Sequence, residues 1–240
     1  VYLATLTNKT FIKKKVINIP IKKIQDNHDY YNFDIIISSN DSNIFKRFKY
    51  AKKIFWMHNT LSLEKSIRKK KFLSLLTNKI TAIFVSKYLK NITSKLYLFD
   101  KSVVIPNFLS KQFIPNKIYK KRKPIFVWSV QRDKGLIETI DIWMNEIYPN
   151  NRNAKFYIFG VKKIPSRFSS KTLLKKNIHF FGKVSKKKLR NIYLKSTAMI
   201  CLGYDETFCL NALEANSCGL PVITFGKTAL SEMITNKKNG

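Results

Sequence analysis

The segment 202–223, LGYDETFCLNALEANSCGLPVI, constrains the fold of this chain more than any other feature. An apolar run at 198–202 precedes a short polar turn, and a stretch with apolar periodicity follows it. Cys218-Gly219 ends that stretch, and a second apolar run begins at Leu220. This order predicts a strand, a turn, a helix and a second strand, which is a βαβ unit. Such units are typical of α/β proteins whose parallel sheet is covered on both faces.

Two acids that are eight positions apart mark this unit. Glu206 closes the polar turn, and Glu214 lies in an otherwise apolar stretch. At about 100° per residue, this spacing places both acids near one face of the predicted helix and its leading edge. An anion at the helix N-terminus would be held by free backbone N–H groups, and the carboxylates would accept hydrogen bonds from sugar or ribose hydroxyls. The alternative, one acid favoured by the helix dipole and one solvated acid, does not explain the apolar neighbours of Glu214.

The segment resembles the signature of glycosyltransferase family 4, the retaining nucleotide-sugar transferases of the GT-B fold. The residues that carry the resemblance are Glu206, Thr207, Phe208, Cys209, Glu214, Ala215, Gly219, Pro221, Val222 and Ile223. Thr207 and Cys209 stand where glycine is commoner in the family. The resemblance extends over residues 30–240 and is densest from residue 125 onward.

Composition favours a folded chain without a membrane span. With 45% hydrophobic residues among 240, the chain can bury a core, which argues against disorder. No apolar run approaches the roughly 18 residues that a spanning helix needs, and the N-terminal residues do not have the pattern of a signal peptide. Cys201, Cys209 and Cys218 are odd in number and lack metal-ligand spacing. We therefore expect buried free thiols in a reducing compartment, and a cytoplasmic protein.

The formal net charge of +32 raises the question of a nucleic-acid partner. Lysine far outnumbers arginine, and asparagine and isoleucine are abundant, as the codon bias of an AT-rich genome would produce. The lysines form short runs across the whole chain, and no DNA- or RNA-recognition motif accompanies them. We expect no nucleic-acid partner. A basic nucleic-acid- or polyanion-binding protein remains the alternative from another functional class.

Strands and helices are expected to alternate along the chain. The predicted strands are 34–37, 53–57, 82–85, 103–105, 124–128, 155–159, 178–181, 198–202 and 220–223, and the predicted helices are 64–77, 136–147, 185–194 and a segment ending at 218. The Lys-rich stretch 110–123 has no apolar periodicity and is interpreted as a linker.

This alternation predicts an α/β fold of two Rossmann-like, doubly wound domains that face a cleft, residues 1–115 and 116–240. The resemblance implies that this is the GT-B fold. It also implies that the N-terminal, acceptor-side domain is incomplete, because all seven glycines lie at or after position 135 and the usual Gly-containing first loop is missing. The second, donor-binding domain is expected to lack the family's final helix.

Several residues are candidates for binding and chemistry. Arg132 and Lys134 follow a predicted strand and precede a helix that begins after Gly135, an arrangement that suits a diphosphate. His58 ends the predicted strand 53–57 and matches the family position whose histidine contacts the transferred sugar. The resemblance implies that His58 and Glu206 are catalytic and that Glu206 holds the sugar hydroxyls. It further implies that the ribose and the rest of the donor are bound by Glu214, Thr207, Phe208, Cys209 and Leu210.

The resemblance implies a retaining hexosyltransferase that moves a sugar from a nucleotide diphosphate donor to an acceptor hydroxyl, in glycan or lipid-linked saccharide assembly. No cofactor and no metal is expected, since the three histidines are far apart and no Asp-x-Asp motif is present. The expected partners are a nucleotide sugar and a saccharide or lipid-linked acceptor. The basic amphipathic segment 64–80 favours a peripheral position on the anionic inner face of a membrane. An inactive remnant of such an enzyme is the alternative within the same fold.

Overall fold

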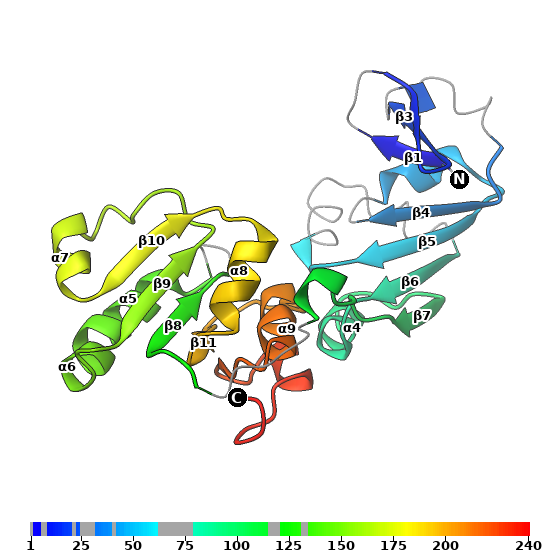
Figure 1. The fold of residues 1–240 in the computed structure, drawn as a ribbon. Helices are drawn as coiled ribbons and strands as arrows, with labels where there is room; N and C mark the ends of the chain where they lie inside the picture. Colours follow the sequence, from blue (N-terminus) through cyan, green and yellow to red (C-terminus); the bar gives the residue numbers. More distant parts are fainter. Residues whose placement is uncertain are drawn as a thin grey trace. The chain divides into compact units, whose positions relative to one another are not determined.

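The computed structural model describes residues 2–5, 9–20, 23–24, 32–39, 42–61, 79–114, 121–130 and 134–240. The chain forms two compact units. The first comprises residues 1–85 and 89–105, and the second comprises residues 86–88 and 106–240. Each unit is built on a parallel sheet (Figure 1).

The first unit contains a four-stranded parallel sheet with the order β4-β5-β6-β7. Its strands are β4 (Ile35–Ser39), β5 (Lys52–Met57), β6 (Ile80–Phe84) and β7 (Lys101–Val104). The 3-10 helix η2 (Asn43–Arg47) lies between β4 and β5 in the chain, and α4 (Lys87–Ser94) lies between β6 and β7. A separate three-stranded sheet has the order β1-β3-β2, with β1 (Tyr2–Thr5), β2 (Phe11–Lys13) and β3 (Val16–Pro20).

The four strands predicted for this unit are confirmed, but the burial of the first is not as predicted. The predicted buried strand, β4, alternates instead: Ile36 is 7% exposed, whereas Ile35 and Ile37 are 53% and 59% exposed. The reason is its place at the end of the described sheet, where β5 is its paired neighbour. The hairpin of β2 and β3 was not predicted, because its turn uses Lys14 and Lys15 at positive φ instead of glycine. The predicted helix 64–77 lies outside the described residues.

The second unit contains a five-stranded parallel sheet with the order β10-β9-β8-β11-β12. Its strands are β8 (Ile125–Trp128), β9 (Lys155–Phe159), β10 (Ile178–Gly182), β11 (Ala198–Ile200) and β12 (Val222–Ile223). Its helices are α5 (Leu136–Ile142), which continues through the π-helical turn η4 (Trp143–Ile147) into α6 (Tyr148–Asn150), then α7 (Ser170–Lys175), α8 (Lys186–Tyr193) and α9 (Leu210–Ser217). Two 3-10 helices, η3 (Lys111–Phe113) and η5 (Ala229–Glu232), complete it.

Aromatic side chains from the strands and from the helix after β8 form the core of this unit. Trp143 stacks on Phe156 with ring centroids 4.9 Å apart, and Trp128 and Tyr193 are fully buried. Phe113 is also fully buried in this core, so part of the segment interpreted as a linker packs against α8 and α9 of the second unit. The contacts divide the chain after Ile105, not after residue 115.

One arginine ties the carboxyl ends of two helices together. The guanidinium of Arg122 donates hydrogen bonds to four backbone carbonyl oxygens, which belong to Tyr193, Ser196, Cys218 and Gly219, at 2.8 to 3.2 Å. These carbonyls lie at or just beyond the ends of α8 and α9, where helices leave acceptors without intrahelical partners. Arg122 therefore holds together the C-terminal ends of α8 and α9. The N-terminal end of α8 follows β10, and the N-terminal end of α9 follows the 201–209 loop.

The strand order locates the position at which such a sheet binds ligands. The chain runs from β8 outward to β9 and β10, then returns to place β11 on the other side of β8. In open α/β sheets, ligands bind outside the carboxyl ends of the two strands where the order reverses. Here these strands are β8 and β11, which lead into α5 and α9. No helix in the described part of the chain is long and apolar enough to cross a membrane.

Candidate functional site

The loops that follow β8 and β11 approach each other closely at the carboxyl end of the sheet. Gly135, at the start of α5, has a φ of 84°, and a Cβ added to it would lie 2.9 Å from the carbonyl oxygen of Leu202. A Cβ on Gly203 would lie 3.0 Å from Cγ of Glu206 and 3.5 Å from Cβ of Lys134. Glycine permits both the left-handed conformation and the close backbone contact. These two glycines therefore let the two loops form one site.

Lys134 and Glu206 meet in this site. The ammonium nitrogen of Lys134 lies 3.4 Å from Oε1 of Glu206 and donates a hydrogen bond to the carbonyl oxygen of Asp205 at 2.8 Å. The Glu206 side chain is 8% exposed, and the Lys134 side chain is 22% exposed. The backbone carbonyl of Glu206 accepts a hydrogen bond from the N–H of Ala229 at 3.0 Å, which connects the loop after β11 to η5. The structure thus brings together a cation and an acid that are 72 positions apart in the sequence.

Two helix N-termini open onto the same edge of the sheet. α5 begins after Gly135 and α9 begins after Cys209, and neither helix has a side-chain N-cap hydrogen bond. An uncapped N-terminus presents backbone N–H groups and a partial positive charge, which favours an anion. Thr207 and Phe208 are half-buried, and Leu210 is exposed as the first residue of α9. Residues 206–209 of the sequence-predicted stretch therefore form a loop, which leads into α9 at Leu210.

Glu214 lies in the middle of α9, where its side chain is 10% exposed. Its Oε1 is 3.9 Å from the ammonium nitrogen of the exposed Lys186, at the start of α8. Burial raises the pKa of the Glu214 carboxyl, and the charge of Lys186 opposes that rise. Sequence analysis missed Lys186, because nothing distinguishes it there from Lys187 and Lys188.

The helical-face argument for the two acids is wrong for Glu206. α9 begins at Leu210, because Cys209 adopts a left-handed conformation with φ of 63°. Glu206 therefore lies in the preceding loop, where helical periodicity does not apply. The two carboxylates have different ion-pair partners, Lys134 for Glu206 and Lys186 for Glu214.

A buried hydrogen-bond network joins the end of β8 to α8 and α9. The hydroxyl groups of Ser129 and Tyr193 are 2.6 Å apart, and the side-chain amide of Asn211 donates to the carbonyl oxygen of Ser129. Burial raises the pKa of the Tyr193 hydroxyl far above its usual range, so this group stays protonated. Sequence analysis did not identify these three residues, through which Ser129, directly after β8, is bonded to Tyr193 of α8 and to Asn211 of α9.

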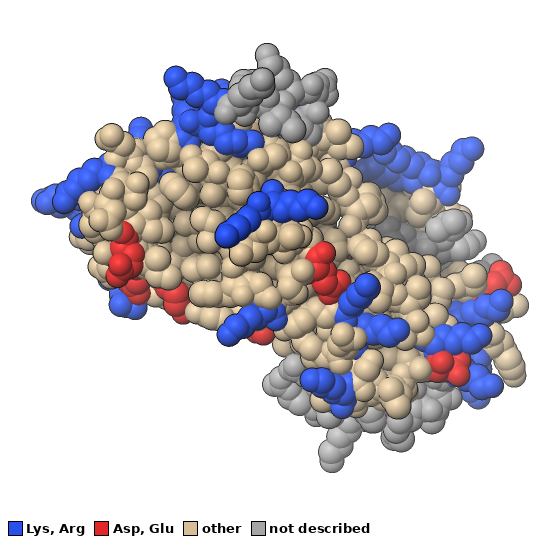
Figure 2. Space-filling model, turned by 90° about the horizontal axis from the view of Figure 1, so that it is seen from below, with Lys and Arg blue, Asp and Glu red and all other residues tan. Residues whose placement is uncertain are grey.

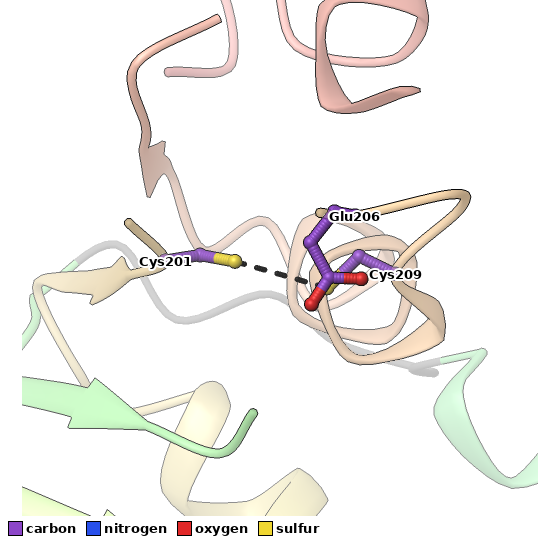
Figure 3. Close-up of side chains that lie close together, drawn as sticks. All are labelled: Cys201, Glu206 and Cys209. Atoms are coloured by element: carbon purple, nitrogen blue, oxygen red, sulfur yellow. Dashed lines mark hydrogen bonds between the residues drawn. The ribbon is translucent and has the colours of Figure 1, made fainter. Parts of the chain in front are cut away.

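Two of the three cysteines lie within the same loop. Cys201 follows β11, Cys209 precedes α9, and their sulfur atoms are 3.8 Å apart with Glu206 beside them (Figure 3). All three cysteines are free and buried, as predicted. The hydrogen bond with Cys201 and burial raise the pKa of the Cys209 thiol. The expectation of no metal-ligand arrangement rested on sequence spacing, but one sulfur or oxygen atom from each of Cys201, Glu206 and Cys209 lies within 4.8 Å of the others.

The remaining predicted residues are not part of this cluster. His58 belongs to the first unit, where it directly follows β5 and stacks on Trp56 with ring centroids 5.5 Å apart. Burial lowers the pKa of the His58 imidazole, which favours its neutral form. Arg132 lies outside the described residues. The roles predicted for both remain predictions.

Comparison with known proteins identifies similar families and folds. Residues 109–240 match the model of the family described as glycosyl transferases group 1. A search of curated protein sequences gives no match.

Three solved structures are similar in fold. The pneumococcal O-GlcNAc transferase GtfA, in complex with UDP and GlcNAc, has a TM-score of 0.71 at 15% identity, over 97% of this chain and 50% of that one. A glycosyltransferase from Rickettsia africae ESF-5 has a TM-score of 0.68 at 20% identity, over 90% of this chain and 63% of that one. WaaG, a glycosyltransferase involved in lipopolysaccharide biosynthesis, has a TM-score of 0.66 at 15% identity, over 97% and 74%. The chain spans only 40 to 44% of several other similar chains. The predicted Rossmann-like GT-B fold is confirmed.

Proposed function

The chain belongs to the group 1 glycosyl transferases, whose family model matches more than half of it, and we propose that it transfers a sugar from a nucleotide diphosphate donor to an acceptor hydroxyl with retention. The observation that carries the proposal is the pairing of Lys134 with Glu206 at the edge where β8 and β11 meet. The uncapped N-termini of α5 and α9 open onto the same edge. The acceptor is a saccharide or a lipid-linked saccharide.

Lys134 and the helix N-termini would bind the diphosphate of the donor. A diphosphate carries more negative charge than the Glu206 carboxylate, so it competes successfully for the Lys134 ammonium. Glu206, released from this ion pair, would then accept hydrogen bonds from the sugar hydroxyls. Because the ammonium and the carboxylate are 3.4 Å apart, one donor molecule can reach both with its diphosphate and its adjoining sugar. Arg132, two residues before Lys134, is expected to contribute a second cation.

Glu214 would bind the ribose of the nucleotide. Its buried carboxylate pays a desolvation cost that Lys186, an exposed cation 3.9 Å away, offsets only in part, since the pKa of the carboxyl is still raised. Two ribose hydroxyls would donate hydrogen bonds to the ionised carboxylate and lower this cost. A binding role therefore explains why a carboxylate is kept in the apolar body of α9.

Retention would follow from the position of the departing diphosphate. Lys134 and the helix N-termini stabilise the charge that develops on the leaving oxygen as the bond to the sugar breaks. That oxygen lies on the face of the sugar from which the acceptor attacks, so it can take the proton of the acceptor hydroxyl. His58, from the first unit, is proposed to contact the transferred sugar. The negative charge of the diphosphate would be neutralised by Lys134, Arg132 and the helix N-termini, so donor binding should need no divalent metal.

Calorimetric titration of the whole chain in the presence of EDTA tests this proposal. The ligands are UDP, GDP and ADP, and the matching nucleosides. Lys134→Ala should weaken the diphosphates more than the nucleosides, and Glu214→Gln should weaken both. Each lost charge-assisted contact should cost on the order of 1.5–3 kcal/mol. Matched controls are Lys175→Ala, near the amino end of β10, and Glu146→Gln, an exposed residue of η4 at the far end of the helix that begins with α5. Equal affinities in all four variants would refute the assignment.

The polyanion-binding alternative predicts a different surface and a different salt response. Lysine and arginine side chains are scattered in separate groups over the face shown in Figure 2, with uncharged surface between them. A binder that neutralises many phosphates loses affinity steeply with salt. The logarithm of its affinity falls linearly with the logarithm of the salt concentration, and the slope is proportional to the number of phosphate contacts. We expect the affinity for nucleoside diphosphates to depend on Lys134 and Glu214 at every salt concentration, which a diffuse binder would not do.

A further inference from the structure

The loop between β11 and α9 brings three side chains close together, those of Cys201, Glu206 and Cys209. Cys201 immediately follows the last residue of β11, Cys209 is the residue before α9, and Glu206 lies in the loop between them. All three side chains are buried, with overall exposures of 0%, 6% and 9% in chain order. Figure 3 shows the sulfur of Cys201 pointing toward Cys209 and Glu206, and the ligand atoms of all three side chains lie within 4.8 Å of one another.

We propose that these three side chains form a binding site for a thiophilic divalent cation such as Zn²⁺. The sulfur atoms of Cys201 and Cys209 are 3.8 Å apart. Two sulfur ligands about 2.3 Å from a tetrahedral zinc ion would lie about 3.8 Å apart, so the sulfurs need no displacement to bind it. Thiolate sulfur with one carboxylate oxygen is a ligand set that suits zinc. The fourth position of the tetrahedron would be left for water.

The charges around the cluster balance once the cation is present. Two thiolates and one carboxylate carry three negative charges in a buried position, which is costly without compensation. The divalent cation supplies two positive charges, and the ammonium of Lys134, 3.4 Å from Glu206 Oε1, supplies the third. Coordination displaces the two thiol protons to solvent.

A disulfide between the two cysteines explains the cluster less well. Its sulfur atoms would have to approach to about 2.05 Å. It would also leave the buried Glu206 carboxylate without a part in the cluster. The cation would use all three groups, whose ligand atoms lie within 4.8 Å of one another.

The proposed site would regulate the donor site, an inference that rests on the proposed function. A cation bound by Glu206 occupies the carboxylate that is assigned to the sugar hydroxyls. Zn²⁺ should therefore weaken the binding of a nucleotide sugar more than the binding of the corresponding nucleoside diphosphate. The cation acts here as an inhibitor, and sugar transfer itself proceeds without it.

Titration of the reduced whole chain with Co²⁺ tests the site without any donor. Thiolate-to-cobalt charge transfer gives an ultraviolet absorption that surface carboxylates and amines cannot produce. The wild-type chain should bind one equivalent with this absorption, and Zn²⁺ should remove it by displacement. Cys201→Ser should lose most of the absorption and at least about tenfold in Co²⁺ affinity. Glu206→Gln should keep the absorption but bind Co²⁺ more weakly.

Cys218→Ser is the matched control, because Cys218 is also buried in the second unit but is not part of the cluster. It should bind Co²⁺ as the wild type does, and circular dichroism should establish that every variant is folded. A wild-type chain without thiolate absorption would overturn the proposal. A folded Cys201→Ser variant that binds like the wild type, or a Cys201–Cys209 disulfide found by mass spectrometry in the purified chain, would also do so. The nucleoside diphosphate titrations in EDTA are independent of these results, so each proposal can fail alone.

Discussion

The close approach of the loops after β8 and β11 can be tested with one pair of glycine substitutions. Gly135 and Gly160 both have a positive φ, of 84° and 81°. A Cβ on Gly160 would meet no atom within 4 Å, whereas a Cβ on Gly135 would lie 2.9 Å from the carbonyl oxygen of Leu202. Gly160→Ala therefore measures the cost of the left-handed conformation alone. Gly135→Ala adds the cost of separating the two loops.

The expected magnitudes follow from these two contributions. The left-handed conformation costs an alanine about 1–2 kcal/mol, so Gly160→Ala should destabilise the chain by that amount. The overlap with Leu202 involves backbone, which cannot rotate away, and steric crowding of this kind costs about 1–3 kcal/mol more. Gly135→Ala should therefore lower the free energy of unfolding by about 2–5 kcal/mol in total. It should also move the 202–206 loop away from Lys134 and weaken nucleoside diphosphate binding.

Urea unfolding and calorimetric titration with a nucleoside diphosphate measure both effects on the same samples. The account predicts that Gly135→Ala is less stable than Gly160→Ala and binds the diphosphate more weakly. Equal stability and equal affinity in the two variants would refute the argument that this contact builds the site.

Three further predictions concern single features of the chain. Because burial raises the pKa of the Glu214 carboxyl above its unfolded value, ionised Glu214 destabilises the fold, so Glu214→Gln should melt higher than the wild type at about pH 7. This difference should shrink as the pH falls through the folded pKa toward the unfolded value of about 4.3. Arg122→Ala leaves four helix-end carbonyls without their donor and should cost about 2–4 kcal/mol by urea unfolding, of which Arg122→Lys should recover only part. Changing Lys69, Lys70 and Lys71 to Glu should reduce co-sedimentation with anionic vesicles, since each basic residue near such a surface adds about 1 kcal/mol.

Each of these predictions has a result that would contradict it. A melting difference for Glu214→Gln that grows toward low pH would have the wrong sign for a raised carboxyl pKa. An Arg122→Ala variant as stable as the wild type would show that the guanidinium does not hold the two helices. If the triple lysine variant co-sediments with anionic vesicles as much as the wild type does, residues 69–71 are not the membrane contact.

The sequence predicted the second sheet well, because its strands are short apolar runs between clear helix signals. β9 has the predicted bounds of 155–159, β8 and β10 each differ from their predictions by one residue at one end, and α8 is one residue shorter at each end. α7 was missed, since its six residues carry too little periodicity to distinguish them from a loop. The burial of β4 could not be predicted, because an apolar run does not reveal whether its strand has neighbours on both sides.

The sequence indicated candidate residues for a site but not the contacts that they make. Glu206, Lys134 and Glu214 were identified from motif and resemblance, but the partners of the acids depend on how the loops fold. The left-handed conformation of Cys209 delays the start of α9, and this conformation is rare for a residue other than glycine. Sequence spacing alone therefore indicated no cluster where the fold forms one.

A structure of the whole chain bound to a nucleoside diphosphate would show whether the edge formed by β8 and β11 binds the donor. The account predicts that the diphosphate lies at the N-termini of α5 and α9 with the Lys134 ammonium in hydrogen-bond contact. The ribose hydroxyls should donate to the Glu214 carboxylate, and the ion pair between Lys134 and Glu206 should be longer than 3.4 Å. A nucleotide bound at another edge of the sheet, or one that leaves Lys134 and Glu214 without contact, would contradict the account.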